Sequence, residues 1–189
     1  FHVGGTAGNV SEISSLKAKF DGVLELDEVR TVISENSEGE KSNIVIGRTG
    51  EMRILDSSTG IAVMTGNVPY GSSLLLKSGV KVKKDDIICS WDPYNAVIIS
   101  EHSGTIAYQD IIQGVTYKVE IDEQTGFQDK VISDNRNKKL VSMLKVLDKK
   151  GNEIKHYTLP VGAHLMVDEG EEIKAGKILV KIPRRGAKA

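Results

Sequence analysis

The residue types that most often carry out chemistry in proteins are few in this sequence and widely spaced. The chain has four histidines and one cysteine. Cys89 lies in the apolar run Ile-Ile-Cys, which predicts a small buried residue rather than a nucleophile. His102, His156 and His164 show none of the short spacings of zinc ligands, and one cysteine cannot form an intrachain disulfide or a CxxC site. We therefore expect no metal site in this chain.

A group of lysines is the clearest charged feature of the sequence. Lys81, Lys83 and Lys84 fall within four residues of one another and precede Asp85 and Asp86. Closely spaced ammonium groups can bind the phosphates of nucleic acids. These three lysines are therefore candidate contacts for DNA or for a protein partner. An exposed turn explains them equally well.

An internal duplication indicates which elements hold these residues. Residues 68–88 match residues 159–179 without a gap, and residues 21–24 and 52–60 resemble 103–106 and 144–151 in the same order. The two copies imply two tandem units, with a net insertion of about ten residues in the second copy around residues 121–139. The identical positions are mostly turn glycines and alternate apolar residues, which a fold constrains most: Pro69/Pro160, Gly71/Gly162, Leu74/Leu165, Gly79/Gly170, Lys83/Lys174 and Ile87/Ile178.

Within each copy the apolar residues alternate with a period of two, as in short β-strands. Residues 44–46, 52–54 and 117–121 follow this pattern, and glycine-containing turn signals separate such runs. Only residues 12–19 have a spacing compatible with a short helix. The sequence therefore predicts an all-β protein built from two small barrels or sandwiches.

Composition excludes several function classes. The 189 residues have a formal net charge of -1, which argues against a dedicated nucleic-acid or anionic-membrane binder and leaves only local patches for such a role. No segment approaches the ~18 consecutive apolar residues of a membrane-spanning helix. A single free thiol fits a reducing compartment. The start lacks an initiator Met and a signal peptide, so we expect a piece of a longer protein.

The strand–turn–strand pattern around Gly79, followed by His-Ser-Gly-Thr-Ile at residues 102–106, resembles the barrel-sandwich hybrid fold of lipoyl and biotinyl carrier domains. The resemblance implies an exposed turn at Lys84 and Asp85. Such carriers attach their cofactor to a lysine at the tip of the following hairpin. The corresponding stretches, residues 90–99 and 183–185, contain no lysine. We therefore expect the carrier fold without the carrier's cofactor.

Residues 1–5, Phe-His-Val-Gly-Gly, resemble the end of the first trigger helix in the β′ subunit family of bacterial RNA polymerases. In several lineages an insertion of two tandem barrel-sandwich hybrid domains interrupts the trigger loop shortly after this motif. The blocks at residues 68–71, 91–93, 122–126 and 182–184 resemble that insertion, so the resemblance covers essentially the whole chain.

The resemblance implies a division of the chain into four segments. Residues 1–15 would be the end of the trigger helix and a linker, and residues 185–189 the return linker. Between them, residues 16–96 and 97–184 would form the two barrel-sandwich hybrid domains.

The resemblance also implies functional roles. In the intact enzyme His2 would face the triphosphate of the incoming nucleotide and hydrogen-bond the pyrophosphate leaving group. Gly4, Gly5 and Gly8 would form part of a hinge. The insertion would tune elongation, pausing and transcript cleavage without catalysis of its own, and the isolated fragment would be inactive and monomeric.

The fragment itself would need no cofactor, whereas magnesium and zinc are expected in the parent subunit. The implied partners are the β, α, ω and sigma subunits, and downstream DNA at the lysine cluster. The implied location is the cytoplasm, without membrane contact. The alternative is a free-standing tandem β-barrel adaptor that binds another protein. That alternative does not explain the Phe-His-Val-Gly-Gly start.

Overall fold

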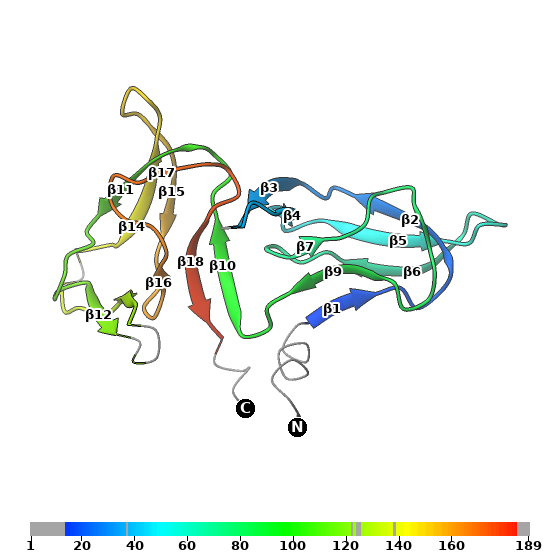
Figure 1. Cartoon of the computed structure of the whole chain (residues 1–189), viewed down its shortest axis with the longest axis horizontal. Helices are drawn as coiled ribbons and strands as arrows, with labels where there is room; N and C mark the ends of the chain where they lie inside the picture. The colour runs from blue at the N-terminus through cyan, green and yellow to red at the C-terminus, as the bar shows by residue number, and fades with distance from the viewer. Residues whose placement is uncertain (1–13, 37, 122, 124–125, 138, 185–189) are drawn as a thin grey trace. The chain divides into compact units, whose positions relative to one another are not determined.

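The computed structural model of the chain describes residues 14–36, 38–121, 123, 126–137 and 139–184. Within them every regular element is a β-strand (Figure 1). The strands group into two compact units, which we call unit 1, ending at Pro93, and unit 2, beginning at Tyr94. The predicted all-β class with two tandem domains is therefore confirmed.

The described part of unit 1 forms two antiparallel sheets. In spatial order the first contains β1 (Ser14–Lys17), β9 (Ile87–Trp91), β7 (Ser73–Leu74), β4 (Lys41–Val45) and β3 (Thr31–Glu35). The second contains β6 (Ala62–Asn67), β5 (Glu51–Leu55), β2 (Gly22–Asp27) and β8 (Lys81–Val82). The alternating apolar residues of these strands give each sheet one face that must be buried, and the two sheets together enclose a core.

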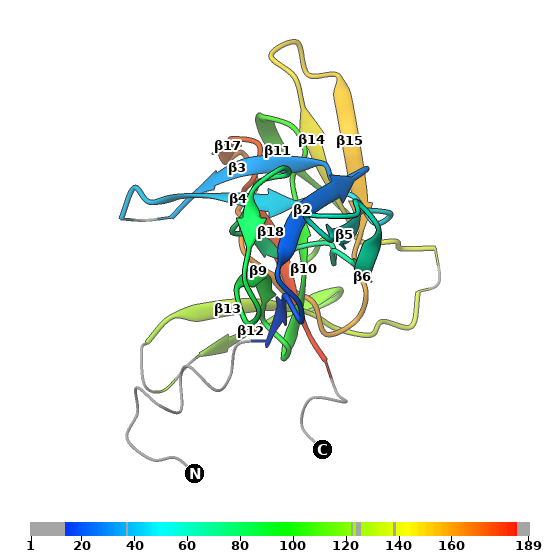
Figure 2. The ribbon, with the colours of Figure 1, turned by 90° about the vertical axis from the view of Figure 1, so that its right-hand side faces the viewer.

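Unit 2 repeats this topology strand for strand. Its first sheet contains β10 (Asn95–Ile99), β18 (Ile178–Pro183), β16 (His164–Leu165), β13 (Gln128–Ile132) and β12 (Tyr117–Ile121). Its second contains β15 (Glu153–Thr158), β14 (Met143–Leu147), β11 (Gly104–Gln109) and β17 (Glu172–Ile173). Figure 2 shows the long β14–β15 hairpin of this unit. The duplication inferred from the sequence is thus a duplication of the fold.

The first and last strands of each unit are neighbours. β1 pairs antiparallel with β9, with Ser14 opposite Trp91. β10 pairs antiparallel with β18 in the same way, with Asn95 opposite Pro183.

The expected short helix at residues 12–19 is not formed by residues 14–19, the part of this range that the structure describes. Ser14–Lys17 is strand β1, and Leu16 lies opposite Cys89 of β9 and packs on the core of unit 1. Pairing with a distant strand buries Leu16 in a way that a short isolated helix could not, so the tertiary contact overrides the local spacing.

The predicted net insertion of about ten residues in unit 2 is present, but it is not confined to residues 121–139. That range contains β13, which pairs with both β12 and β16 and has a counterpart in unit 1. The extra length is instead divided among three connections, at residues 110–116, 122–127 and 133–142. Surface connections tolerate added residues, whereas an extra residue inside a paired strand would reverse its inward face.

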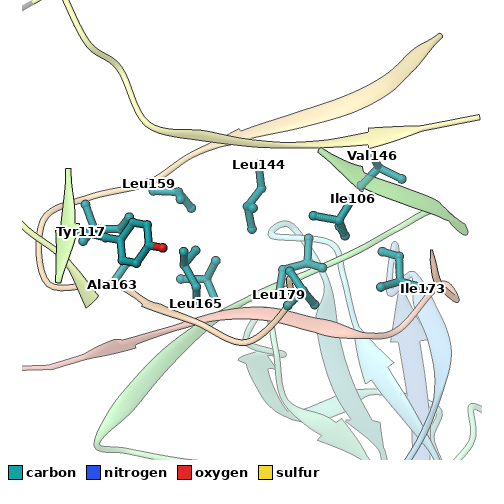
Figure 3. Close-up of a cluster of buried hydrophobic side chains, with 12 residues drawn as sticks. Ile106, Tyr117, Leu144, Val146, Leu159, Ala163, Leu165, Ile173 and Leu179 are labelled. Carbon is teal, nitrogen blue, oxygen red and sulfur yellow. The ribbon is translucent and has the colours of Figure 1, made fainter. Parts of the chain in front are cut away.

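Each unit has its own hydrophobic core. In unit 2, Leu144 and Val146 of β14 point into a core that also contains Leu165 and Leu179 of the opposite sheet (Figure 3). Complete burial of such a side chain stabilises a fold by about 1.5–3 kcal/mol. The unit 1 residues at matching positions are also fully buried: Leu24 for Ile106, Met52 for Leu144, Ile54 for Val146 and Ile88 for Leu179. Trp91, the only tryptophan of the chain, packs against the unit 1 core.

Candidate functional site

Only some of the residues predicted to be functional lie in the part of the chain that the structure describes. His2, Gly4, Gly5 and Gly8 lie outside the described residues. The lysines are described: Lys81 lies on β8, and Lys83 and Lys84 lie in the connection from β8 to β9. The candidate site is therefore built from the lysines.

Residues 83–86, which we call the lysine turn, close on themselves. The backbone N–H of Lys83 donates to the Asp86 Oδ2 carboxylate oxygen at 2.9 Å, and the N–H of Asp86 donates to the Lys83 carbonyl at 3.0 Å. Asp85 occupies the left-handed region, with φ of 77°. Aspartate tolerates this conformation better than most residues because its short side chain is polar.

The lysine turn is attached to the segment that follows β1. The N–H of Asp85 donates to the Ala18 carbonyl at 2.7 Å, and the N–H of Ala18 donates to the Asp86 carbonyl at 2.9 Å. The N–H of Lys84 also donates to Asp21 Oδ1 at 2.8 Å. These hydrogen bonds hold Lys17 and Lys19, the neighbours of Ala18, beside the turn. Ala18 is buried, whereas the side chains of Lys17 and Lys19 are exposed.

The structure therefore enlarges the predicted lysine cluster. We call the five exposed lysines Lys17, Lys19, Lys81, Lys83 and Lys84 the basic patch. Sequence reasoning missed the first two because nothing local connects residue 18 with residue 85. The available signal was the order Lys-Ala-Lys, in which a small apolar residue separates two charges as on a half-buried strand.

The ammonium groups of the basic patch form no ion pair with any carboxylate of the described residues. Residues 17–21 and 81–86 contain three aspartates, of which Asp21 and Asp86 accept backbone N–H groups. Five lysines against three aspartates leave a local excess of positive charge in a chain whose net charge is -1. Such an excess attracts polyanions over about one Debye length.

The counterpart in unit 2 has the same backbone scaffold. The N–H of Gly176 donates to the Ser100 carbonyl at 2.8 Å, and the N–H of Ser100 donates to the Lys177 carbonyl at 2.9 Å. The N–H of Ala175 donates to Ser103 Oγ at 3.0 Å, in the place of the Lys84–Asp21 hydrogen bond. The side chains differ, because the positions of Lys17, Lys19, Lys81 and Lys84 hold Ile99, Glu101, Glu172 and Ala175. The concentration of lysines is specific to unit 1.

The two turns predict a stabilising substitution. Gly176 occupies the position of Asp85 with φ of 95°, a conformation that glycine adopts without a side-chain penalty. Asp85→Gly should raise the free energy of unfolding by about 0.5 kcal/mol, because the relieved strain slightly exceeds the added chain entropy. Urea unfolding followed by Trp91 fluorescence measures it. Asp86→Gly is the control and should lower stability, since it removes the acceptor of the Lys83 N–H. An Asp85→Gly protein less stable than its parent would contradict this assignment.

A second polar cluster lies in unit 2 and was not predicted. Lys130 Nζ on β13 lies 2.9 Å from Asp168 Oδ1 and 3.3 Å from Tyr108 Oη, and its charge lies over the Tyr117 ring. The Tyr108 hydroxyl donates to the Val167 carbonyl at 2.6 Å. These contacts join β11 of one sheet to β13 of the other.

The protonation states of this cluster indicate a structural role. Burial raises the pKa of Tyr108. Burial lowers the pKa of Lys130, but its hydrogen bonds to Asp168 and Tyr108 outweigh this effect, so that the net pKa is raised. Both groups keep their protons near neutral pH and cannot act as general bases there. The cluster therefore links the two sheets of unit 2 through side-chain contacts, and we call it the clasp.

The remaining candidates are also accounted for. Cys89 is buried, as predicted, and burial raises the pKa of its thiol, which disfavours the reactive thiolate. In the portion of the chain that is described, no three histidine, cysteine or acidic side chains cluster as metal ligands would. The same portion contains no helix with the length and apolarity of a membrane span.

Comparisons of the sequence with known proteins identify relatives of this chain. No family model matches the chain. The chain is 57% identical over 189 residues to the DNA-directed RNA polymerase subunit beta' of Flavobacterium johnsoniae. It is 46% identical over 190 residues to that of Parabacteroides distasonis, and 44% identical over 189 residues to that of Bacteroides fragilis. Each alignment covers 100% of this chain but 13% of the relative, so the chain spans about an eighth of their length. The predicted resemblance to the β′ subunit family is confirmed, and the chain is a homologue, over its whole length, of one segment of the DNA-directed RNA polymerase subunit beta'.

Proposed function

We propose that this chain acts in DNA-templated RNA synthesis as a segment of an RNA polymerase β′ subunit, without chemistry of its own. The observation that carries the proposal is the similarity over the entire chain to relatives named DNA-directed RNA polymerase subunit beta'. Two copies of one β-fold, each with its own core, suit a mechanical role.

The finer proposal is that the segment interrupts the trigger loop. The Phe-His-Val-Gly-Gly motif at residues 1–5 supports it, since it resembles the end of the first trigger helix. Residues 16–96 and 97–184 are then the two inserted domains, and residues 1–15 and 185–189 connect them to the loop. In the intact enzyme His2 contacts the nucleotide triphosphate.

The insertion acts by biasing the folding of the loop. Close-packed cores make each domain stiff, so the motion falls on the connecting segments, with Gly4, Gly5 and Gly8 as hinge residues. Any contact that favours one position of the domains shifts the balance between the folded and unfolded loop. A difference of ~1.4 kcal/mol changes that ratio tenfold. Elongation, pausing and transcript cleavage all depend on this ratio.

The proposal also implies the partners, the cellular location and the metals of the parent subunit. Its partners are the other polymerase subunits, β, α, ω and sigma, which it meets as part of the parent chain in the cytoplasm. The parent subunit would hold magnesium and zinc.

Deletion in the intact polymerase tests the proposal. An enzyme in which a short glycine linker replaces residues 8–184 should still polymerise, with a pause lifetime that differs from the parent by severalfold. Single-round transcription on a template with one defined pause site measures both quantities. An enzyme lacking only residues 94–184, which removes β10 to β18, gives the effect of one domain. Identical elongation rates and pause lifetimes in all three enzymes would refute the regulatory role.

A further inference from the structure

We propose that the basic patch of unit 1 binds the phosphate backbone of a nucleic acid, and that the matching surface of unit 2 does not. This inference rests on the proposed function, because the parent polymerase would supply the nucleic acid. The chemistry recognised is a row of phosphates rather than a particular base sequence.

The backbone of the patch is held in place before any ligand arrives. Lys17 and Lys19 flank Ala18, which is 1% exposed and hydrogen-bonded in both directions to the lysine turn. Lys83 and Lys84 lie in a turn closed by Asp86 and attached through Asp21. Only the flexible lysine side chains must become ordered on binding, which limits the entropic cost.

The charges of the patch are available to a polyanion. None of its ammonium groups is paired with a carboxylate of the described residues, whereas Lys130 in unit 2 is paired with Asp168 at 2.9 Å. Lysine ammonium groups on long stems contact phosphates as point charges, and each contact releases condensed counterions. The resulting affinity must fall steeply with salt concentration.

An exposed aromatic residue adjoins the basic patch in the sequence. Phe20 follows Lys19 directly and is 49% exposed. An aromatic ring beside lysines can stack on an unpaired base, which is a common feature of single-strand binding. Both a duplex and a single strand offer the phosphates, and only the single strand offers the unpaired base.

Unit 2 provides the internal comparison. Its turn is held by the same backbone hydrogen bonds, but Glu101 and Glu172 replace Lys19 and Lys81. These two carboxylates add negative charge to the surface that carries Lys174 and Lys177, although Glu101 Oε2 also lies 3.9 Å from Lys155 Nζ. A less positive surface attracts phosphates less. The difference between the units therefore lies in side-chain charge on a common scaffold.

The test uses the whole 189-residue chain and fluorescently labelled DNA of about 20 base pairs or about 20 nucleotides. Binding is measured by fluorescence anisotropy over a range of salt concentrations. The test variant combines K17Q, K19Q, K83Q and K84Q. The control in unit 2 combines K174Q and K177Q, and K83Q/K84Q alone removes the same number of charges from unit 1 as this control does from unit 2. Trp91 fluorescence in urea confirms that each variant is folded.

The parent chain should bind, and its logarithmic affinity should decrease linearly with the logarithm of salt concentration. The quadruple variant should bind at least about tenfold more weakly at low salt and lose about 0.9 of slope for each phosphate contact removed. The unit 2 control should match the parent. F20A should weaken binding to the single strand alone if Phe20 stacks, and neither probe if the patch contacts only phosphates.

No binding by the parent chain, or equal losses in the quadruple variant and the unit 2 control, would overturn the inference. So would a patch that binds only an acidic protein. Failure here is distinguishable from failure of the proposed function. Unaltered DNA binding in the quadruple variant would refute only the proposed nucleic-acid contact. Unchanged pausing after deletion of residues 8–184 would refute only the proposed regulatory role.

Discussion

Gly22→Ala in unit 1 and Gly104→Ala in unit 2 should each lower the free energy of unfolding by about 1–3 kcal/mol, the cost of overpacking a dense core. A methyl group at Gly22 would collide with the carbonyl oxygen of Leu55 and lie 2.7 Å from Ile54 Cγ2. At Gly104 it would collide with the carbonyl oxygen of Leu147 and lie 2.8 Å from a Val146 methyl carbon. A backbone oxygen cannot move away without disturbing the pairing of β2 with β5 or of β11 with β14.

Urea unfolding measures both effects. Trp91 reports on unit 1, and circular dichroism reports on both units. Gly47→Ala is the matched control, because the nearest atom to a methyl group there is 3.7 Å away and the residue is buried in the same unit. A Gly22→Ala protein as stable as the Gly47→Ala protein would show that the strands separate more easily than the structure implies.

Leu144→Ala should lower the free energy of unfolding of unit 2 by about 2–5 kcal/mol, the usual range for a buried leucine. Leu144 is fully buried between the two sheets (Figure 3), so its truncation leaves a cavity that the surrounding structure fills only in part. Circular dichroism during urea unfolding gives the value.

Leu144→Met is the control, since unit 1 has Met52 at the same position of its own core. A substitution that conserves volume should cost less than about 1.5 kcal/mol. Equal losses for alanine and methionine would indicate that the shape of the side chain, rather than its volume, determines stability at this position.

The elements that sequence alone predicted are those in which local chemistry decides the structure. Gly79 and Gly170 both adopt positive φ, as expected for turn glycines shared by the two copies. Gly22 and Gly104 align in the repeat because a close backbone approach excludes side chains at both positions. A geometric requirement of this kind restricts the residue type at one position, so it can be recognised in the sequence.

What the sequence could not show depends on partners that are distant along the chain. Ser14–Lys17 is a strand because β9 is beside it, and Lys17 and Lys19 join the patch because Ala18 binds Asp85 and Asp86. The clasp around Lys130 combines side chains from three separated segments. None of these pairings has a periodicity or motif that a local pattern could indicate.

The pairing of the first and last described strands brings the two ends of each unit together. Opposed Cα atoms in antiparallel strands are about 4.5–5.5 Å apart, so the chain enters and leaves unit 1 at almost one point, beside Ser14 and Trp91. Unit 2 closes in the same way at Asn95 and Pro183, where the Arg184 N–H also donates to the Tyr94 carbonyl at 2.8 Å. Domains whose two ends lie close together are those that tolerate insertion into another chain, and both units meet this geometric condition.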